Sequence, residues 1–244
     1  MDTDGHRYTL DAPAGEQVRI RAINNRGQVV GYWHAMRGPQ HAFIWDKIGR
    51  MRDHGPPGNL ESFACDINDW EQIVGFFSTS TNVWRAFVHD PNLGMQQLGP
   101  THYDEGMCCI NNRGFVVGQF GSTQPGLCVS TWTARTGPQP LPLKGGDFLL
   151  VCGLNDADHY LVNVGRKGIR VGRREFRRRS ESHLWQSGRH VRRLTVRLCC
   201  GDDLRHRNVT AVIGWDINKD GTILGAMMMK GSPEWHAVIL EPME

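Results

Sequence analysis

The chain has 244 residues and a formal net charge of +3, which is too small to indicate a nucleic-acid or membrane partner for the whole molecule. No apolar run approaches the roughly 18 residues of a membrane span, and residues 1–13 lack the hydrophobic core of a secretory signal. The seven cysteines are an odd number, which argues against an ordinary disulfide framework. We therefore expect a cytoplasmic protein, with secretion after removal of a signal peptide as the alternative.

The composition favours an all-β fold. The chain contains 29 glycines, 12 prolines and many Val, Ile and Trp residues, and long apolar patterns of helical period are missing. β-branched and aromatic side chains suit a pleated, half-buried surface, and Gly and Pro suit tight turns. The composition thus predicts many short strands.

A segment built around Ile-Asn or Leu-Asn recurs along the chain as a short apolar strand, a polar turn and a second strand. The leading asparagines, at intervals of 44, 43, 44 and 63 residues, are Asn24, Asn68, Asn111, Asn155 and Asn218. A third strand is predicted at 41–45, 85–89, 129–132, 182–185 and 236–240, and a fourth at 50–53, 95–98, 139–141 and 191–194. Four strands in a repeat of about forty residues are typical of a β-propeller blade.

The last repeat has no fourth strand before Glu244, and residues 6–10 offer a spare strand ahead of the first repeat. We therefore expect one domain over residues 1–244, a five-bladed β-propeller of four-stranded antiparallel blades, whose ring closes when the N-terminal strand completes the last blade. The expected blades are 17–55, 61–99, 104–143, 148–196, and 208–244 together with 6–13.

The repeats resemble the HAF-repeat family, named for a triplet that stands here as His41-Ala42-Phe43. Repeats two and three keep the Ile-Asn turn, and the fifth keeps His236-Ala237. The resemblance covers nearly the whole chain and implies the propeller architecture. It implies no common activity and no catalytic residues.

Acidic and aromatic residues recur in the connections between the expected strands. In four repeats an acidic residue lies seven or eight positions before the leading asparagine, at Glu16, Glu61, Asp104 and Asp147. Aromatic or imidazole side chains precede the third strands, at Trp33, His34, Trp84 and Trp235. Carboxylates beside indoles at one channel mouth favour binding of a polar small molecule or glycan. Solvated acidic loops and tryptophans that pack between blades are the alternative.

The same connections leave an enzyme open, namely a lyase, isomerase, cyclase or glycoside hydrolase. Its general acid and base would come from Asp104, Glu61, His102 and His206. Phosphate-binding glycine loops and zinc or calcium motifs are absent from the sequence, so no cofactor is expected. Cys65, Cys108 and Cys152 occupy one repeat position, where we expect buried apolar filler rather than a metal site.

A basic cluster spans residues 166–179, between the second and third strands of the fourth repeat. A solvated extension of the hairpin is one interpretation. The other is a scaffold that docks an acidic protein through Arg173, Arg174 and Arg177. Nucleic acid is not expected, because RNA-binding motifs and interleaved aromatic residues are absent from the cluster.

Overall fold

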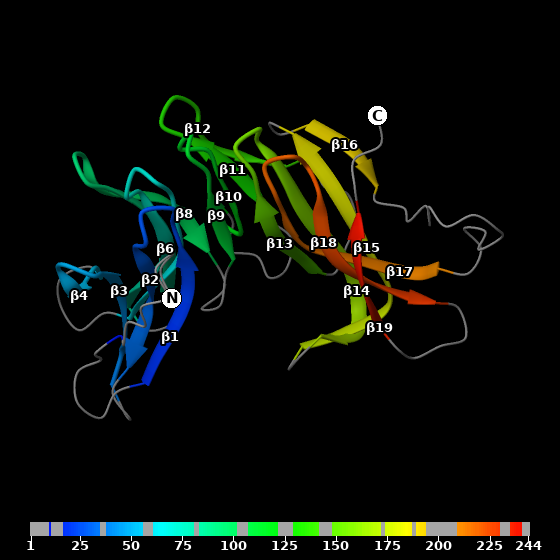
Figure 1. Cartoon of the computed structure of the whole chain (residues 1–244), viewed down its shortest axis with the longest axis horizontal. Coiled ribbons are helices and arrows are strands. Elements are labelled where there is room, and N and C mark those ends of the chain that lie inside the picture. The colour runs from blue at the N-terminus through cyan, green and yellow to red at the C-terminus, as the bar shows by residue number, and fades with distance from the viewer. Residues whose placement is uncertain are drawn as a thin grey trace. The chain divides into compact units, whose positions relative to one another are not determined.

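The computed structural model describes residues 10, 17–34, 38–55, 61–80, 83–101, 107–121, 129–141, 148–171, 174–186, 189–193, 209–229 and 235–240. These residues form strands, turns and bends, and among them no helix is long and apolar enough to cross a membrane. The strands form five sheets, each a meander of consecutive strands, coloured in chain order in Figure 1.

The first sheet contains β1 (Gln17–Ile23), β2 (Val29–His34), β3 (Gln40–Asp46) and β4 (Arg50–Asp53). The second contains β5 (Ser62–Ile67), β6 (Ile73–Ser80), β7 (Val83–Asp90) and β8 (Gly94–Thr101). The third contains β9 (Cys108–Ile110), β10 (Val116–Gly118), β11 (Ser130–Thr133) and β12 (Gly137–Pro140). The fourth contains β13 (Phe148–Leu154), β14 (His159–Val171), β15 (Arg174–Gln186) and β16 (Arg189–Arg193). The fifth contains β17 (Val209–Ile217), β18 (Ile223–Met229) and β19 (Trp235–Leu240).

The predicted all-β fold of antiparallel sheets is confirmed, and the third strands of all five repeats and the fourth strands of the first four overlap the predicted ranges. Four sheets have four strands each, and the described residues of the fifth sheet form three strands. Residues 6–9, which are expected to complete that sheet, lie outside the described residues. Leu10 packs against the core of the first sheet.

The chain divides into two compact units, Met1–Pro125 with Trp132–Pro138, and Gly126–Thr131 with Gln139–Glu244. Within each unit, the residue before a leading asparagine shares a hydrophobic cluster with the second strand of the preceding sheet, and in the first unit with its third strand as well. These sets are Ile67 with Val30 and Ile44, Ile110 with Val74 and Val88, and Ile217 with Leu161. Apolar packing between consecutive sheets thus supplies much of the core.

The first strand of the repeat carries an irregularity at one fixed position. The register shifts there in four sheets, at Arg21, Cys65, Cys152 and Trp215. Opposite this bulge the second strand requires glycine in the first two sheets. A Cβ on Gly31 would lie 2.0 Å from the carbonyl oxygen of Arg19, and one on Gly75 would lie 2.2 Å from that of Phe63. The recurring Val-Gly sequence is therefore explained by close backbone approach.

The basic cluster belongs to a long hairpin of β14 and β15. Its strands pair as far as Val171 with Arg174, with register irregularities between Gly165 and Ile169. The predicted hairpin extension is confirmed in its backbone.

Candidate functional site

Each repeat turns at its leading asparagine through the same hydrogen bonds. The side-chain Oδ1 of Asn24 accepts from the backbone N–H groups of Arg26 and Gln28, at 3.1 and 2.9 Å. The same two bonds form in the other four turns, at Asn68, Asn111, Asn155 and Asn218. The amide oxygen thus holds its own turn, as Asn commonly does.

The amide nitrogen of the same side chain joins one repeat to the next. Asn24 Nδ2 donates to the carbonyl oxygen of Asn68 at 2.9 Å, and Asn68 Nδ2 donates to that of Asn111 at 2.9 Å. In the second unit, Asn155 Nδ2 donates to the carbonyl oxygen of Asn218 at 3.0 Å. Consecutive turns are thereby tied together in a regular geometry.

The third residue after the leading asparagine has a left-handed backbone in all five turns. Glycine occupies the position three times, with φ of 76° at Gly27, 72° at Gly114 and 84° at Gly221. The other two turns have Glu71 and Asp158, with φ of 63° and 58°. Side chains are uncommon in this backbone region, so Glu71 and Asp158 depart from the local preference.

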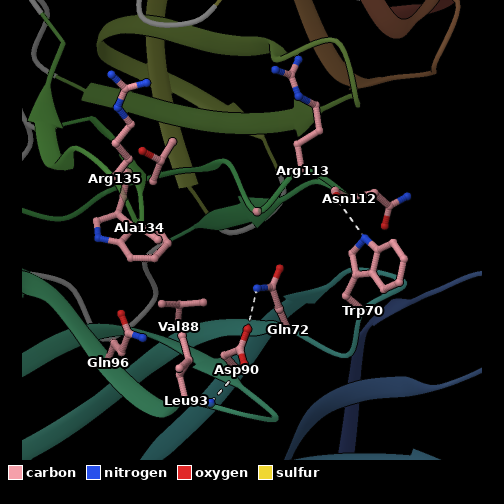
Figure 2. A pocket seen from close by; sticks show the side chains of 13 residues that line it. Trp70, Gln72, Val88, Asp90, Leu93, Gln96, Asn112, Arg113, Ala134 and Arg135 are labelled. Atoms are coloured by element: carbon pink, nitrogen blue, oxygen red, sulfur yellow. Dashed lines mark hydrogen bonds between the residues drawn. The ribbon is translucent and has the colours of Figure 1, made fainter.

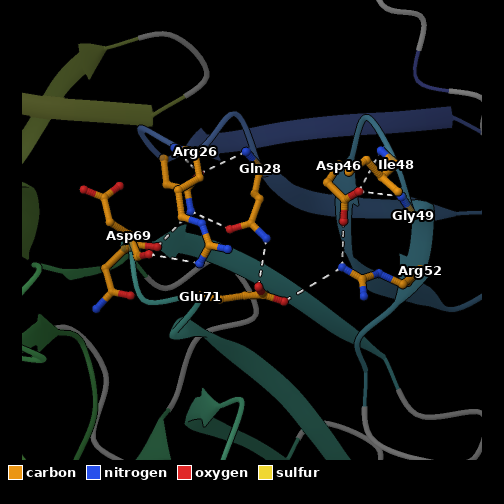
Figure 3. Close-up of polar contacts among 10 residues, drawn as sticks. Arg26, Gln28, Asp46, Ile48, Gly49, Arg52, Asp69 and Glu71 are labelled. Carbon is orange, nitrogen blue, oxygen red and sulfur yellow. Dashed lines mark hydrogen bonds and ion pairs between the residues drawn. The ribbon is translucent and has the colours of Figure 1, made fainter.

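Between the first and second sheets, the side chain of Glu71 fills the space beside the turns, which we call the first groove. Gln28 Nε2 donates to Glu71 Oε2 at 2.9 Å, and Arg52 Nη2 lies 3.8 Å from Glu71 Oε1. Arg52 Nη2 also donates to Asp46 Oδ2 at 2.8 Å. Figure 3 shows this network spanning the two sheets. The first groove is therefore occupied by the protein's own polar groups.

Between the second and third sheets, the equivalent space is open, and we call it the second groove. Gly114 takes the place of Glu71 and contributes no side chain. A pocket of about 430 Å³ remains. The second sheet and its turns contribute Trp70, Gln72, Val88, Asp90, Leu93 and Gln96, and the third contributes Asn112–Gly114 and Trp132–Arg135.

The second groove combines apolar surfaces with amide groups. Trp70 is 67% exposed, and its Nε1 donates to the carbonyl oxygen of Asn112 at 2.9 Å, which orients the indole beside the third sheet. Figure 2 shows Trp70 and Arg135 at opposite ends of the pocket, with Val88 and Asp90 between them. An aromatic face beside hydrogen-bonding groups suits a small molecule with both apolar and polar sides.

Asp90 is the one carboxylate among the described residues that line the second groove, and it is held in its ionised form. Gln72 Nε2 donates to Asp90 Oδ2 at 2.7 Å, and the N–H groups of Asn92 and Leu93 donate to Oδ1 at 2.8 and 3.1 Å. These bonds, that of Gln72 first, lower the pKa of Asp90 below its usual value. The arginines of the pocket, Arg113 and Arg135, extend their guanidinium groups away from Asp90 in Figure 2.

Two histidines face each other where the first and second sheets meet. The rings of His54 and His89 lie 4.1 Å apart in an edge-to-face arrangement. His54 Nε2 and His89 Nδ1 are buried and have no hydrogen-bond partner among the described residues. Burial, the neighbouring His89 and then Arg52 lower the pKa of His54 to about 4, and burial also lowers the pKa of His89. Both imidazoles are therefore neutral at physiological pH.

Two of the tryptophans predicted to bind a ligand lie against hydrophobic clusters. Trp84 is only 8% exposed and lies in the core of the first unit, with its ring 5.3 Å from that of Phe63. Because the indole of Trp84 is buried, it offers no exposed ring for the ligand-binding role that the sequence predicts. Trp33 stacks on His41 at 4.4 Å, beside the core of the first sheet.

The other predicted residues are only partly described. His34 ends β2, and Glu61 precedes β5, where its backbone exchanges hydrogen bonds with Ser78. Only the backbone is described for Trp235 in β19 and for Arg174 and Arg177 in β15. The residues outside the described part are Glu16, His102, Asp104, Asp147, Arg173 and His206. The channel-mouth site and the basic docking site therefore stay predictions.

The cysteines that share a repeat position lie against apolar clusters. Cys108 is buried in the core of the first unit, and Cys65 packs against the same cluster. Burial, followed by the hydrogen bond with Cys65, raises the pKa of the Cys108 thiol well above its usual value. Burial raises the pKa of Cys152 to about 12, and Asn163 Nδ2 donates to its Sγ at 2.9 Å. The described residues contain no group of three or more His, Cys, Asp or Glu that could hold a metal ion.

The second groove lies at the opposite end of the sheets from the connections in which the sequence predicts a site. Its residues come from the turns between first and second strands and between third and fourth strands. Trp70 and Trp132 were not singled out by the repeat pattern. A usable signal was present, because Glu71 stands where the first, third and fifth turns have glycine. Glutamate at this position corresponds to the filled first groove, and glycine corresponds to the open second groove.

No family model and no curated protein sequence matches the chain. Among solved structures, TolB from Acinetobacter baumannii is 13% identical with a TM-score of 0.54, over 88% of this chain and 50% of TolB. A fucose-specific lectin from Aleuria aurantia is 9% identical with a TM-score of 0.47, over 93% of this chain and 78% of the lectin. A gluconolactonase from Xanthomonas campestris is 10% identical with a TM-score of 0.47, over 93% and 78%.

This chain therefore spans about half the length of TolB. The lectin and the gluconolactonase are too distant to say what this chain binds. The likeness to TolB concerns the fold alone, and together with the repeated antiparallel meanders it assigns the chain to the β-propeller fold.

Proposed function

We propose that this chain is a binding module that holds a polar small molecule or glycan in the second groove. The observation that carries the proposal is the contrast between two equivalent spaces. The first groove is filled by Glu71 and its partners, whereas the second retains a pocket of about 430 Å³ beside an exposed indole. A pocket of this size falls within the range of about 300–1,000 Å³ that small-ligand sites occupy.

The chemistry of the second groove fits a sugar ring. A pyranose has an apolar face of C–H groups and an edge of hydroxyls, so it needs an aromatic or aliphatic platform and nearby amides. Trp70 and Leu93 offer exposed apolar surface, and the side-chain amide of Gln96 lines the same pocket. Asp90 adds an ionised acceptor, because its low pKa keeps it charged at neutral pH.

We also propose the finer architecture of a closed five-bladed ring of HAF repeats. Support comes from Ile23, which is 67% exposed although its equivalent Ile67 is 4% exposed in a cluster with Val30 and Ile44. In the fifth sheet, the equivalents of Val30 and Ile44 are Leu224 and Ile239, and both are exposed, at 48% and 69%. Apolar side chains that are exposed at positions buried elsewhere in the repeats are what supports this proposal.

Binding is tested by isothermal titration with glucose, galactose, mannose and fucose, followed by an array of neutral oligosaccharides. We expect at least one of these probes to bind. Trp70→Ala should weaken that binding at least about tenfold, which corresponds to about 1.4 kcal/mol, because the variant loses the aromatic platform. Trp70→Phe keeps an aromatic face and should retain most of the affinity.

The matched control is Ile48→Ala, because Ile48 is exposed in the turn between β3 and β4 and does not line the pocket. Its affinity should equal that of the wild type. The proposal fails if none of the probes binds, or if Trp70→Ala binds as tightly as Ile48→Ala.

A further inference from the structure

The first and second grooves are built on the same frame. Gln28, Asp46 and Arg52 of the first repeat correspond in register to Gln72, Asp90 and Gln96 of the second. Asp46 Oδ1 accepts from Ile48 and Gly49 N–H groups, as Asp90 Oδ1 does from Asn92 and Leu93. The carboxylates thus hold equivalent turns.

The two grooves differ in the residue that the following repeat contributes, which is Glu71 in the first groove and Gly114 in the second. Gln28 Nε2 donates to Glu71, across the groove, whereas the equivalent Gln72 Nε2 donates to Asp90 within its own sheet. Gly114 has no side chain to offer an acceptor, and a Cβ built on it would lie 3.4 Å from Gln72 Oε1, which is an ordinary contact distance. A side chain at this position would therefore enter the second groove from the same direction from which Glu71 enters the first.

The backbone does not forbid such a side chain. Glu71 has a φ of 63° and Gly114 a φ of 72°, so the two residues share one left-handed conformation. Glu71 is thus a glutamate that accepts a backbone suited to glycine, and its carboxylate lies within reach of the Gln28 amide and the Arg52 guanidinium. That carboxylate therefore takes up the donor groups that face the first groove.

We propose that the residue three positions after the leading asparagine decides whether an inter-repeat groove can take a ligand. Gly114 is then the specificity-determining residue that opens the second groove to a polar small molecule or glycan. Glu71 is a tethered carboxylate that fills the first groove, a space otherwise suited to a ligand bearing a carboxylate. The part that concerns Gly114 rests on the proposed function, and the part that concerns Glu71 is independent of it.

The first test closes the second groove by transplanting the network of the first. The double variant Gln96→Arg/Gly114→Glu recreates both partners, and we expect at least about a tenfold loss of affinity for whichever panel sugar binds the wild type. Gly27→Glu is the matched control, because Gly27 also has a left-handed φ of 76° but has no atoms within 4 Å of an added Cβ. It should bind like the wild type.

The reciprocal test opens the first groove with Glu71→Gly, a change that relieves an unfavourable backbone conformation and so should fold. The probe is sodium acetate, compared with sodium chloride at equal ionic strength. We expect acetate to raise the unfolding temperature of Glu71→Gly and to leave that of the wild type unchanged, because acetate can occupy the space of the lost carboxylate. Adding Arg52→Gln to the variant should remove the acetate effect.

The outcomes separate the two proposals. If no panel sugar binds the wild type, the proposed function fails, while the acetate response of Glu71→Gly still supports the role of Glu71. If a sugar binds the wild type and the double variant equally well, the role of Gly114 is overturned and the proposed function stands. An unfolding temperature of Glu71→Gly that does not respond to acetate overturns the role of Glu71.

Discussion

At the scale of single residues, the leading asparagine fulfils two separate requirements in three of the described repeats, at Asn24, Asn68 and Asn155. Its oxygen closes the local turn, and its nitrogen bonds to the backbone of the next turn. An aspartate could replace the first function but not the second, because a carboxylate has no N–H group. The recurring Ile-Asn pair is therefore a signature of contact between repeats as well as of a turn.

His54 should make the stability of the protein depend on pH. Its pKa in the folded chain is about 4, below the ordinary value of 6.5, so between these pH values the unfolded chain binds a proton that the folded chain does not. Stability should accordingly be highest above pH 6.5 and fall as the pH drops toward 4, by up to about 3 kcal/mol from this group. Urea unfolding at pH 7 and pH 5 measures the loss.

The variant His54→Leu provides the comparison, because Leu98 occupies the corresponding place in the second sheet. It should lose clearly less stability between pH 7 and pH 5, with His89 left to titrate. Equal losses in the wild type and the variant would show that His54 is not the group responsible.

At the scale of strands, the glycine of the second strand is set by the bulge that faces it. The bulge brings a carbonyl oxygen of the first strand close to the second strand, and the space left has no room for a Cβ. This constraint differs from that of the turn glycines, where the positive φ favours glycine but also accepts Glu71 and Asp158.

Gly75→Ala should be severely destabilising for this reason. The new methyl group would lie 2.2 Å from the carbonyl oxygen of Phe63 and 2.9 Å from the ring of Phe87, so the strands must separate. We expect a loss of more than about 3 kcal/mol in the free energy of unfolding. Gly94→Ala is the control, because Gly94 has a φ of 74° but open space around it, and should cost about 1 kcal/mol. Urea unfolding measures the free energy of unfolding of both variants. A similar small loss of stability in Gly75→Ala and Gly94→Ala would contradict the predicted clash.

At the scale of the whole molecule, ring closure makes Ile23 a test residue. If the ring is closed, Ile23→Asp buries a carboxylate among apolar side chains and should cost about 2–4 kcal/mol. If Ile23 faces solvent, the same change should cost no more than about 0.5 kcal/mol. Thermal and urea unfolding beside the control Ile48→Asp measure this difference, and size-exclusion chromatography shows whether a second copy covers the face instead.

Much of this architecture was predictable because it rests on repetition. The fourth strand of the first repeat, predicted at 50–53, is β4 (Arg50–Asp53), and the long hairpin around the basic cluster also forms as predicted. The second groove was not predictable in the same way. It depends on which side chains meet across two repeats, and Trp70 and Trp132 lie more than sixty residues apart in the chain.

The left-handed turn position has a consequence for how such a chain can diversify. Glycine and glutamate both fit the same backbone there. A codon change from glycine (GGN) to glutamate (GAR) can therefore turn an open groove into a filled one and leave every strand unchanged. Asp158 shows a third residue accepted at the same place. Proteins built on this one scaffold can therefore differ in the number of open grooves, and in which grooves are open.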